Sequence, residues 1–128
     1  FCSAPSNWPC ITKVKLGAKK DGTVIANDYY LCEEIGAALN NTFFSGRLSS
    51  SGAAPCYRWA EKGKTSNMRM DTYAVSTNTV PAAEYRGLGC PEAEFGIECL
   101  MNQLADELGM SPVEIRMKNI IVNGERNC

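Results

Sequence analysis

The chain has 128 residues, 45% hydrophobic and 21% charged, which is the balance of one soluble globular domain able to bury a core. Its 13 Lys and Arg against 14 Asp and Glu give a net charge of −1, so no partner nucleic acid or anionic membrane is expected. Because histidine is absent, Ser/His/Asp and Cys/His catalysis and His-ligated zinc are excluded for anything these residues do alone.

The sequence begins at Phe1 rather than Met and ends at Cys128 just after a polar stretch. We interpret residues 1–128 as a single domain that is a fragment of a larger protein. No apolar run reaches 18 residues, so no membrane span is expected.

Seven cysteines make up about 5% of the chain, below the roughly 8–10% that marks a disulfide scaffold. Their number is odd, and no CxxC pair or other zinc or iron–sulfur spacing occurs. We therefore expect reduced, mostly buried thiols in a cytoplasmic protein. Cys90, just before Pro91 at a predicted helix start, is the one candidate for a nucleophilic thiol, although no general base lies nearby in the sequence.

Residues 12–18 alternate between apolar and basic side chains, which predicts a half-buried strand. A turn follows, and residues 23–31 are rich in β-branched and aromatic side chains. The two strands are predicted to form an antiparallel hairpin closed at Asp21–Gly22.

The pattern weakens over residues 35–64, where a short helix through Leu39 or Ala53 is one interpretation. Alternation returns over residues 67–77 and predicts a third strand with two partly apolar faces, which we place inside a sheet. One face holds Met68, Met70, Thr72 and Ala74, and the other holds Arg69, Asp71, Tyr73 and Val75.

The last third is predicted to be a helical hairpin. Pro91 suits the start of the first helix, and Gly109 its end. Ser111, Pro112 and Glu114 indicate the capping box of a second helix. The buried stripes are predicted as Ala93, Ile97, Leu100, Leu104 and Leu108 on the first helix, and Val113, Met117 and Ile120 on the second. Antiparallel strands packed with this helical hairpin make an α+β domain.

The segment between the third strand and the first helix, residues 77–91, carries two glycines and two prolines. Gly87 and Gly89 would let the backbone approach a ligand, the free amides of the following helix could face an oxygen or anion, and Arg86 could add a donor. An ordinary connection with Arg86 in a structural salt bridge is an equal alternative. A dinucleotide site is disfavoured, because GxGxxE lacks the third glycine and no βαβ unit surrounds it.

Two stretches carry a resemblance to a known family. They are TNTVPAAEYRGLGCPEAEFGIECLMNQLADELGMSPVEIRMKN at residues 77–119 and, more weakly, VKLGAKKDGTVIA at residues 14–26. Together they resemble the molybdenum-cofactor-binding large subunits of the xanthine dehydrogenase, aldehyde oxidase and carbon monoxide dehydrogenase family.

The resemblance implies an oxidoreductase that hydroxylates a small-molecule substrate, an aldehyde or electron-poor heterocycle, with oxygen from water. The implied cofactors are molybdopterin on the large subunit and iron–sulfur and flavin groups in partner domains or subunits. Tyr85, Arg86 and Gly87 would contact the molybdopterin. Leu88 takes a position where several members place an aromatic that packs on the substrate, and it leaves the substrate class open. Arg47 is a second candidate substrate contact.

No residue matches the family's catalytic carboxylate, so no catalytic residue is expected in this chain. Glu92, Glu94, Glu98 and Glu107 are predicted to be first-turn and solvent-face helix residues. The leading hypothesis is a fragment that supplies a cofactor-contact loop and scaffold, inactive alone, with exposed apolar surface that favours self-association. The alternative is a structural or assembly module that binds no cofactor; thiol redox or zinc chemistry through Cys90 is a third hypothesis.

Overall fold

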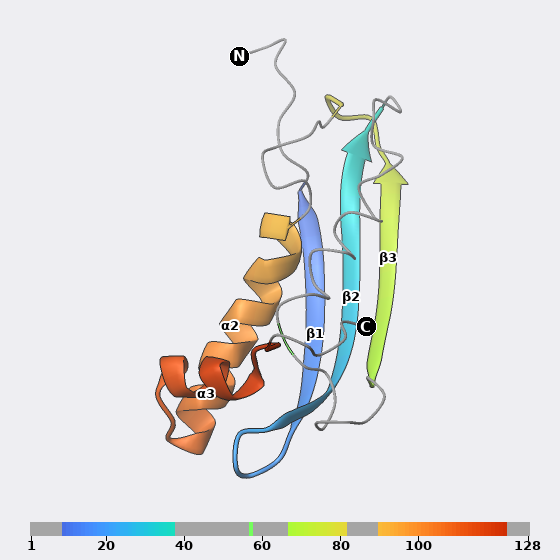
Figure 1. The fold of residues 1–128 in the computed structure, drawn as a ribbon. Coiled ribbons are helices and arrows are strands. Elements are labelled where there is room, and N and C mark those ends of the chain that lie inside the picture. Colours follow the sequence, from blue (N-terminus) through green and yellow to red (C-terminus); the bar gives the residue numbers. More distant parts are fainter. Residues whose placement is uncertain (1–8, 38–56, 58–66, 82–89, 123–128) are drawn as a thin grey trace.

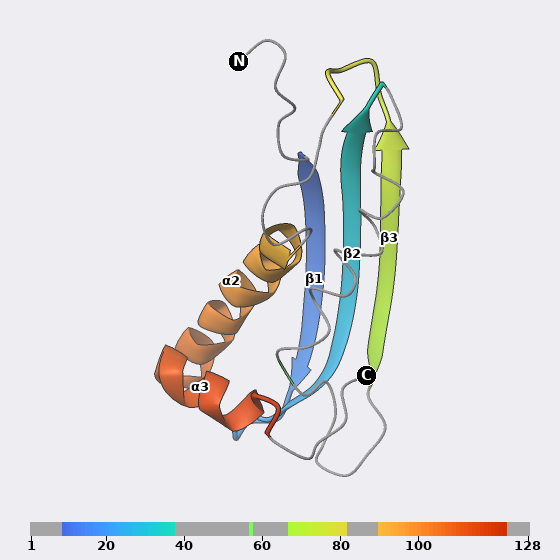
Figure 2. The ribbon, with the colours of Figure 1, turned by 45° about the horizontal axis from the view of Figure 1, so that its top comes forward.

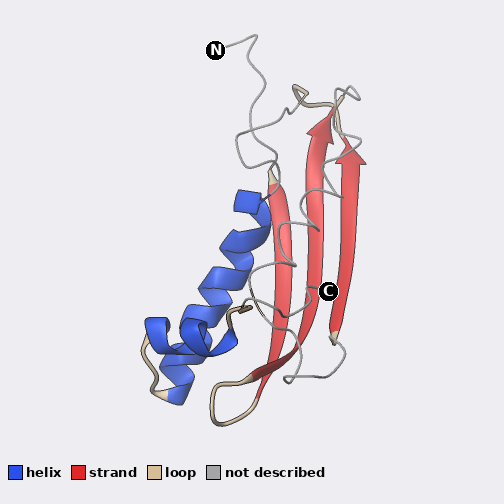
Figure 3. Cartoon of the chain, in the orientation of Figure 1, coloured by secondary structure: helices blue, strands red, loops and turns tan. Residues whose placement is uncertain are grey.

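The computed structural model describes residues 9–37, 57, 67–81 and 90–122. The elements in these ranges are β1 (Cys10–Ala18), β2 (Val24–Gly36), β3 (Met68–Ser76), α2 (Cys90–Leu108) and α3 (Pro112–Asn119) (Figure 1). The strands form one sheet in the order β1-β2-β3, and both helices lie on the β1 side of it (Figure 3). The predicted α+β class is confirmed.

β1 and β2 form the antiparallel hairpin that the alternation predicted. The Asp21 carboxylate shapes its turn by accepting hydrogen bonds from the Thr23 backbone N–H and hydroxyl, each at 3.0 Å. Lys118 of α3 pairs with the same carboxylate at 3.1 Å. These contacts, the Thr23 N–H first among them, lower the pKa of Asp21 to about 2. The turn is therefore tied to α3 at neutral pH.

β3 runs parallel to β2, with Met68 opposite Asn27 and Ser76 opposite Gly36. The sheet is therefore mixed rather than wholly antiparallel. Residues 37–67 provide the long connection that a parallel pair requires. The placement of the third strand inside a sheet is wrong for the described part of the chain, where β3 is an edge strand with Tyr73 and Val75 exposed. Alternation predicts which residues share a face of a strand, but neither its direction nor its neighbours.

Alternate residues of the strands point toward the helices and form the core. At Gly96, α2 lies so close to β1 that a Cβ would be 2.6 Å from Thr12 Cγ2. Figure 2 shows α2 alongside β1, with α3 folded back beside its end. The fully buried apolar residues of this cluster are Val24, Tyr29, Leu31, Ala93, Ile97, Met101, Ala105 and Ile115.

The helices occupy the predicted positions, but the buried stripe of α2 is rotated from the prediction. Met101 and Ala105 are buried where Leu100 and Leu104 were expected, and Leu100 and Leu104 are only partly buried. Small and flexible side chains face the sheet because the helix packs closely there. Gly109, with φ +65°, ends α2 as predicted.

The predicted buried face of α3 is wrong. Val113 and Met117 are 70% and 68% exposed, and Ile120 is exposed at 42%, whereas Ile115 and Asn119 are buried. The predicted cap is confirmed, since Ser111 Oγ accepts a hydrogen bond from the Glu114 N–H at 3.0 Å. The buried face of α3 therefore carries Ile115, which packs in the core, and the hydrogen-bonded Asn119.

Asn119 joins α3 to the start of β2. Its Oδ1 accepts from the Val24 N–H at 2.8 Å, and its Nδ2 donates to the carbonyls of Gly22 at 2.9 Å and Ile115 at 2.8 Å. All these groups are buried, so rotating α3 to bury Val113 would leave several polar atoms without partners.

Glu98 is not the solvent-face residue that was expected. Its Oε2 accepts hydrogen bonds from Arg116 Nε at 2.8 Å and Nη2 at 2.5 Å, and its Oε1 accepts from the Tyr57 hydroxyl at 2.6 Å. Tyr57 also forms a β-bridge with Ile120. This group of side chains links α2, α3 and residue 57.

The described cysteines are free but are not the mostly buried thiols that were expected. Cys10, Cys90 and Cys99 are exposed and Cys32 is half-buried. Neither helix in the described ranges is long and apolar enough to cross a membrane.

Candidate cofactor-contact site

All the residues predicted to contact cofactor or substrate, namely Tyr85, Arg86, Gly87, Leu88 and Arg47, lie outside the described residues. The structure describes the two segments that flank the first four: residues 77–81, which follow β3, and the first turn of α2. In Figure 1 the carboxyl-terminal ends of β2 and β3 and the first turn of α2 lie toward the same end of the molecule. Both ends of segment 82–89 are thus held by described elements.

Glu34, near the end of β2, holds the segment that follows β3. Its Oε1 accepts hydrogen bonds from the hydroxyls of Thr77 at 2.7 Å and Thr79 at 2.5 Å, and these hydroxyls lie 2.8 Å apart. The hydrogen bonds, that of Thr79 first, lower the pKa of Glu34 below its usual value. We call these three residues the Glu34 clamp. The Glu34 carboxyl group is ionised at neutral pH, so both threonines donate to a charged acceptor.

The backbone continues the same attachment beyond the end of the ladder. Thr77 N–H donates to the Gly36 carbonyl at 3.1 Å, and Ala37 N–H donates to the Thr79 carbonyl at 3.1 Å. Gly36 has φ +79°, and a Cβ there would lie 2.6 Å from both Val80 O and Pro81 Cα. Only glycine allows residues 80–81 to pass this close to β2. The direction in which the chain leaves toward residue 82 is therefore set by Gly36.

On the other side of the segment, β2 holds the first turns of α2. The Tyr29 hydroxyl donates to the Ala93 carbonyl at 3.1 Å, and the ring is fully buried. Burial is the main cause that raises the pKa of Tyr29 to about 12. Tyr29 is therefore a neutral, permanent hydrogen-bond donor near neutral pH, and it anchors the helix start to the sheet.

Glu92 lies in the first turn of α2, as predicted, but it is buried there, which was not foreseen. It is 6% exposed, and neither carboxylate oxygen has a hydrogen-bond partner among the described residues. The amino-terminal end of a helix favours a negative charge, but a buried carboxylate also needs hydrogen-bond donors. The Glu92 oxygens therefore remain available to a donor group.

Further negative charge lies close by. The pKa of the Cys10 thiol is raised, chiefly by burial. A hydrogen bond with Thr12 lowers this pKa, and the negative charges of Glu33 and Glu92 raise it further. Cys10 stands opposite Glu33 in the β1–β2 register. A thiol with a raised pKa is a poor nucleophile at neutral pH. The buried carboxylates at this end of the sheet suit a ligand group that donates hydrogen bonds.

The predicted alternative chemistry at Cys90 has limited support. Cys90 is exposed in the first turn of α2. Within the ranges described, no three His, Cys, Asp or Glu side chains are grouped so that they could hold a metal ion.

Sequence reasoning missed the Glu34 clamp, Gly36 and the burial of Glu92. The predicted second strand ended at residue 31, before Glu34 and Gly36, and the parallel register that joins them to residues 76–81 was not foreseen. The only local indication was the pair of hydroxyls two residues apart, Thr77 and Thr79, directly after the third strand.

Comparison with known proteins gives a consistent result. Residues 1–120 match the family model described as molybdopterin cofactor-binding domain. An aldehyde oxidoreductase from Megalodesulfovibrio gigas is 36% identical over 120 residues, which are 93% of this chain and 12% of that protein. A probable xanthine dehydrogenase component from Bacillus subtilis is 31% identical over 112 residues, 88% of this chain and 14% of that protein.

Solved structures share the fold. The aldehyde oxidoreductase of Desulfovibrio gigas aligns with a TM-score of 0.79 and 35% identity, over 94% of this chain and 13% of that one. Quinoline 2-oxidoreductase of Pseudomonas putida 86 aligns with a TM-score of 0.80 at 24% identity, over 91% of this chain and 14% of that one, which shows the fold alone. The chain thus spans 12–14% of the length of these relatives. It belongs to the molybdopterin cofactor-binding domain family.

Proposed function

We propose that this chain is part of the large subunit of a molybdenum-dependent hydroxylase of the xanthine dehydrogenase and aldehyde oxidase type. It contributes a molybdopterin-contact loop and its scaffold, and it is inactive alone. The enzyme's other parts are the remaining domains of the large subunit and the iron–sulfur and flavin domains or subunits, in the cytoplasm. Its substrate is a small aldehyde or heterocycle.

The observation that carries the proposal is the family match over residues 1–120, which includes segment 82–89 and both of the elements that hold it. In the proposal, Tyr85, Arg86 and Gly87 face the cofactor, with Gly87 allowing close approach of the backbone and Arg86 adding a charged donor. The Glu34 clamp and Gly36 hold one end of that segment, and Tyr29 holds the other.

The described residues fit a pterin group at this end of the sheet. A pterin ring carries amino and N–H donors, and the buried oxygens of Glu92 lack donors within the described ranges. When bound, molybdopterin supplies the metal and the redox chemistry of hydroxylation. The role of this chain is to bind the cofactor and to orient the substrate. Glu92 accepts hydrogen bonds from the pterin, while Leu88 and Arg47 contact the substrate and orient it. No residue of this chain is assigned a proton transfer.

The test is elemental analysis for molybdenum, with a fluorescence assay for oxidised pterin, on the full-length protein from its own source. About one molybdenum and one pterin per subunit is the expected result. A well-folded protein with neither would refute the proposal and favour the structural or assembly module.

A glycine substitution tests the loop itself. In the full-length protein, Gly87→Val is expected to lower molybdenum and pterin content by at least about tenfold. The valine side chain would block the close approach of the backbone to the cofactor, and a loss of about 1.4 kcal/mol in binding free energy lowers the affinity tenfold. Gly17→Ala is the matched control, since its Cβ would meet only an ordinary contact at 3.4 Å. Unchanged cofactor content in Gly87→Val would remove Gly87 from the contact site.

A further inference from the structure

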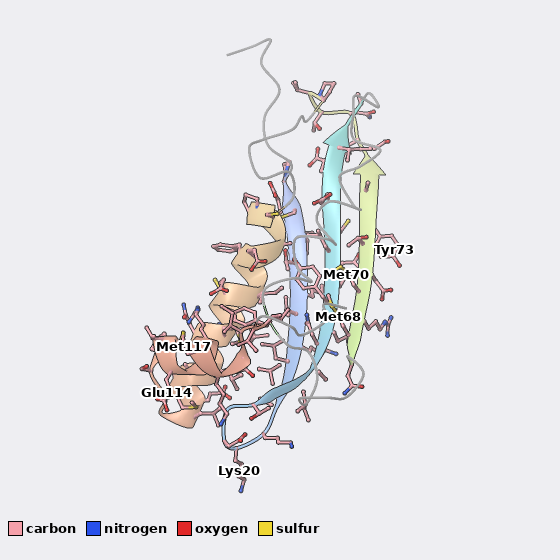
Figure 4. The ribbon with its side chains drawn as sticks, viewed as in Figure 1. Lys20, Met68, Met70, Tyr73, Glu114 and Met117 are labelled. Atoms are coloured by element: carbon pink, nitrogen blue, oxygen red, sulfur yellow. The ribbon has the colours of Figure 1, made fainter. Side chains whose placement is uncertain are left out.

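The sheet has a second face, opposite the helices, and several apolar residues lie in its upper half. Val14, Leu16, Met68 and Met70 pack on the helix side, so the residues between them point the other way. Figure 4 shows Tyr73 on the far side of β3 from Met68 and Met70. We define the outer face by its apolar residues: Ile11, Tyr30, Cys32, Tyr73 and Val75, which the register sets side by side.

Charged residues share this face, since Lys13 and Asp71 stand on either side of Tyr30 in the register and Glu34 stands opposite Val75. A one-sided sheet normally alternates apolar residues toward the core with polar residues toward solvent. Here Ile11, Tyr73 and Val75 are 62%, 52% and 43% exposed. Ile11 of β1 and Tyr73 of β3 stand on either side of Cys32 of β2 in the register, so they form one apolar row across the sheet. An exposed apolar row with charged residues around it marks an interaction surface.

The patch is ordered before any partner arrives. The rings of Tyr30 and Tyr73 lie 5.4 Å apart, and Lys13 Nζ lies 5.5 Å from the centre of the Tyr30 ring. Such packing lowers the entropy lost on docking, because the aromatic side chains already hold one another in place.

The lower half of the outer face is polar and balanced in charge. Arg69 pairs with Asp71 at 2.6 Å and approaches Asp28 at 3.9 Å. Beside them is a groove of about 420 Å³ where the small residues Gly17 and Ala26 face each other across the strands. The groove is also lined by the charged residues Lys15, Asp28 and Arg69. Charges of both signs suit the side chains of a protein surface rather than a polyanion.

The size of the face indicates what kind of protein covers it. The three strands have 9, 13 and 9 residues. At about 3.3 Å per residue and about 4.8 Å between strands, they cover roughly 500 Å² per side, or about 1,000 Å² in total. Stable complexes of separate proteins bury about 1,200–2,000 Å², whereas domains of one chain meet over about 600–1,500 Å². The face is thus too small for a stable dimer and large enough for a partner on the same polypeptide.

We propose that the outer face is the docking surface for another domain of the same large subunit, with an apolar contact layer over Tyr73 and Cys32. This inference rests on the proposed function in one respect, that the chain is part of a longer subunit. It is supported by the relatives, of whose length this chain spans 12–14%.

Cys32 reports on this docking, because its half-buried thiol lies between Ile11 and Tyr73 in the register. In the full-length protein, native Cys32 is expected to react with N-ethylmaleimide at least about tenfold more slowly than in urea, since labelling then requires local opening. Tyr73→Glu is expected to raise the native rate at least about tenfold. Val113→Glu, at an exposed apolar residue of α3, is the matched control and should leave the rate unchanged.

Native labelling of Cys32 at nearly the rate seen in urea would overturn the proposal, and so would equal rates in wild type and Tyr73→Glu. Protection of Cys32 that appears in the 128-residue chain only as its concentration rises would also overturn it, by identifying a second copy as the occupant. Protected Cys32 in a protein without molybdenum or pterin would support docking while refuting the proposed function. Reactive Cys32 in a molybdenum-replete protein would refute docking alone.

Discussion

Replacing Gly36 by alanine tests whether β2 sets the path of the chain toward the cofactor-contact segment. The residue has φ +79°, which costs alanine about 1–2 kcal/mol. The new Cβ would also lie 2.6 Å from Val80 O and Pro81 Cα, both backbone atoms that cannot move as a side chain does. Relieving such overlap costs about 1–3 kcal/mol more. We expect Gly36→Ala to lower the free energy of unfolding by about 2–5 kcal/mol.

Gly109 offers a matched control. Its φ is +65°, but a Cβ there would meet nothing within 4 Å. Gly109→Ala therefore carries only the backbone cost of about 1–2 kcal/mol, and both variants gain the same small benefit from a less flexible unfolded chain. The difference between the two variants isolates the close approach of residues 80–81 to β2.

The stability assay is urea unfolding of the 128-residue chain, and the functional assay is molybdenum and pterin content of the full-length protein. Gly36→Ala should lose more unfolding free energy and more molybdenum and pterin content than Gly109→Ala. Equal losses of unfolding free energy would show that the contact with residues 80–81 carries no stability. Full cofactor content in a destabilised Gly36→Ala protein would show that this contact does not position the segment.

Three further substitutions test contacts in the frame of the site and in the core. The pKa of Glu34 lies below the usual 4.5 in the folded state, so the Glu34 carboxylate contributes to stability above pH 4.5, and this contribution is lost as pH falls through the folded-state pKa. Glu34→Gln should remove this part of the pH dependence from acid unfolding curves. Asn119→Ala should cost about 2–4 kcal/mol in urea unfolding by leaving buried backbone groups without partners, whereas exposed Asn102→Ala should cost under about 1 kcal/mol. The pKa of Tyr29 is raised to about 12 in the folded state, so its contribution to the free energy of unfolding is complete below pH 10 and is lost as pH rises from 10 through 12. Tyr29→Phe should therefore lose less unfolding free energy at alkaline pH than wild type. An identical loss would show that another group titrates.

The hairpin and the helix ends were predictable because their determinants are local. Asp21 and Thr23 are two residues apart, and Ser111 and Glu114 three, so the turn and the cap are complete within one short stretch of sequence. Gly109 ends α2 by its own backbone conformation. None of these features depends on a distant part of the chain.

The orientation of α3 was not predictable, because its determinant is distant. The apolar pattern favoured burial of Val113 and Met117, but the Asn119 side chain bonds Val24, which is 95 positions away. The observed face buries Ile115 in the core, and it lets the Asn119 amide bond two buried backbone groups of the hairpin, Val24 N–H and Gly22 C=O. Turning the helix would leave both of those groups without partners, which costs about 1–3 kcal/mol each. A polar residue in a short helix can thus decide which face is buried.

The Glu34 clamp shows the same limit at the candidate site. Alternation predicts a strand that reaches Thr77, but the second strand predicted at residues 23–31 stops before Glu34. The contact between Glu34 and Thr77 exists only because β3 runs parallel to β2, so that both strands end on the same side of the sheet. An antiparallel third strand would carry Thr77 to the opposite end, and Glu34 would be one more exposed carboxylate. The long connection of residues 37–67 permits the parallel pairing, and nothing in residues 67–77 encodes it. The loop of the candidate site could therefore be proposed from its glycines, whereas the residues that hold the two ends of this loop required the strand directions.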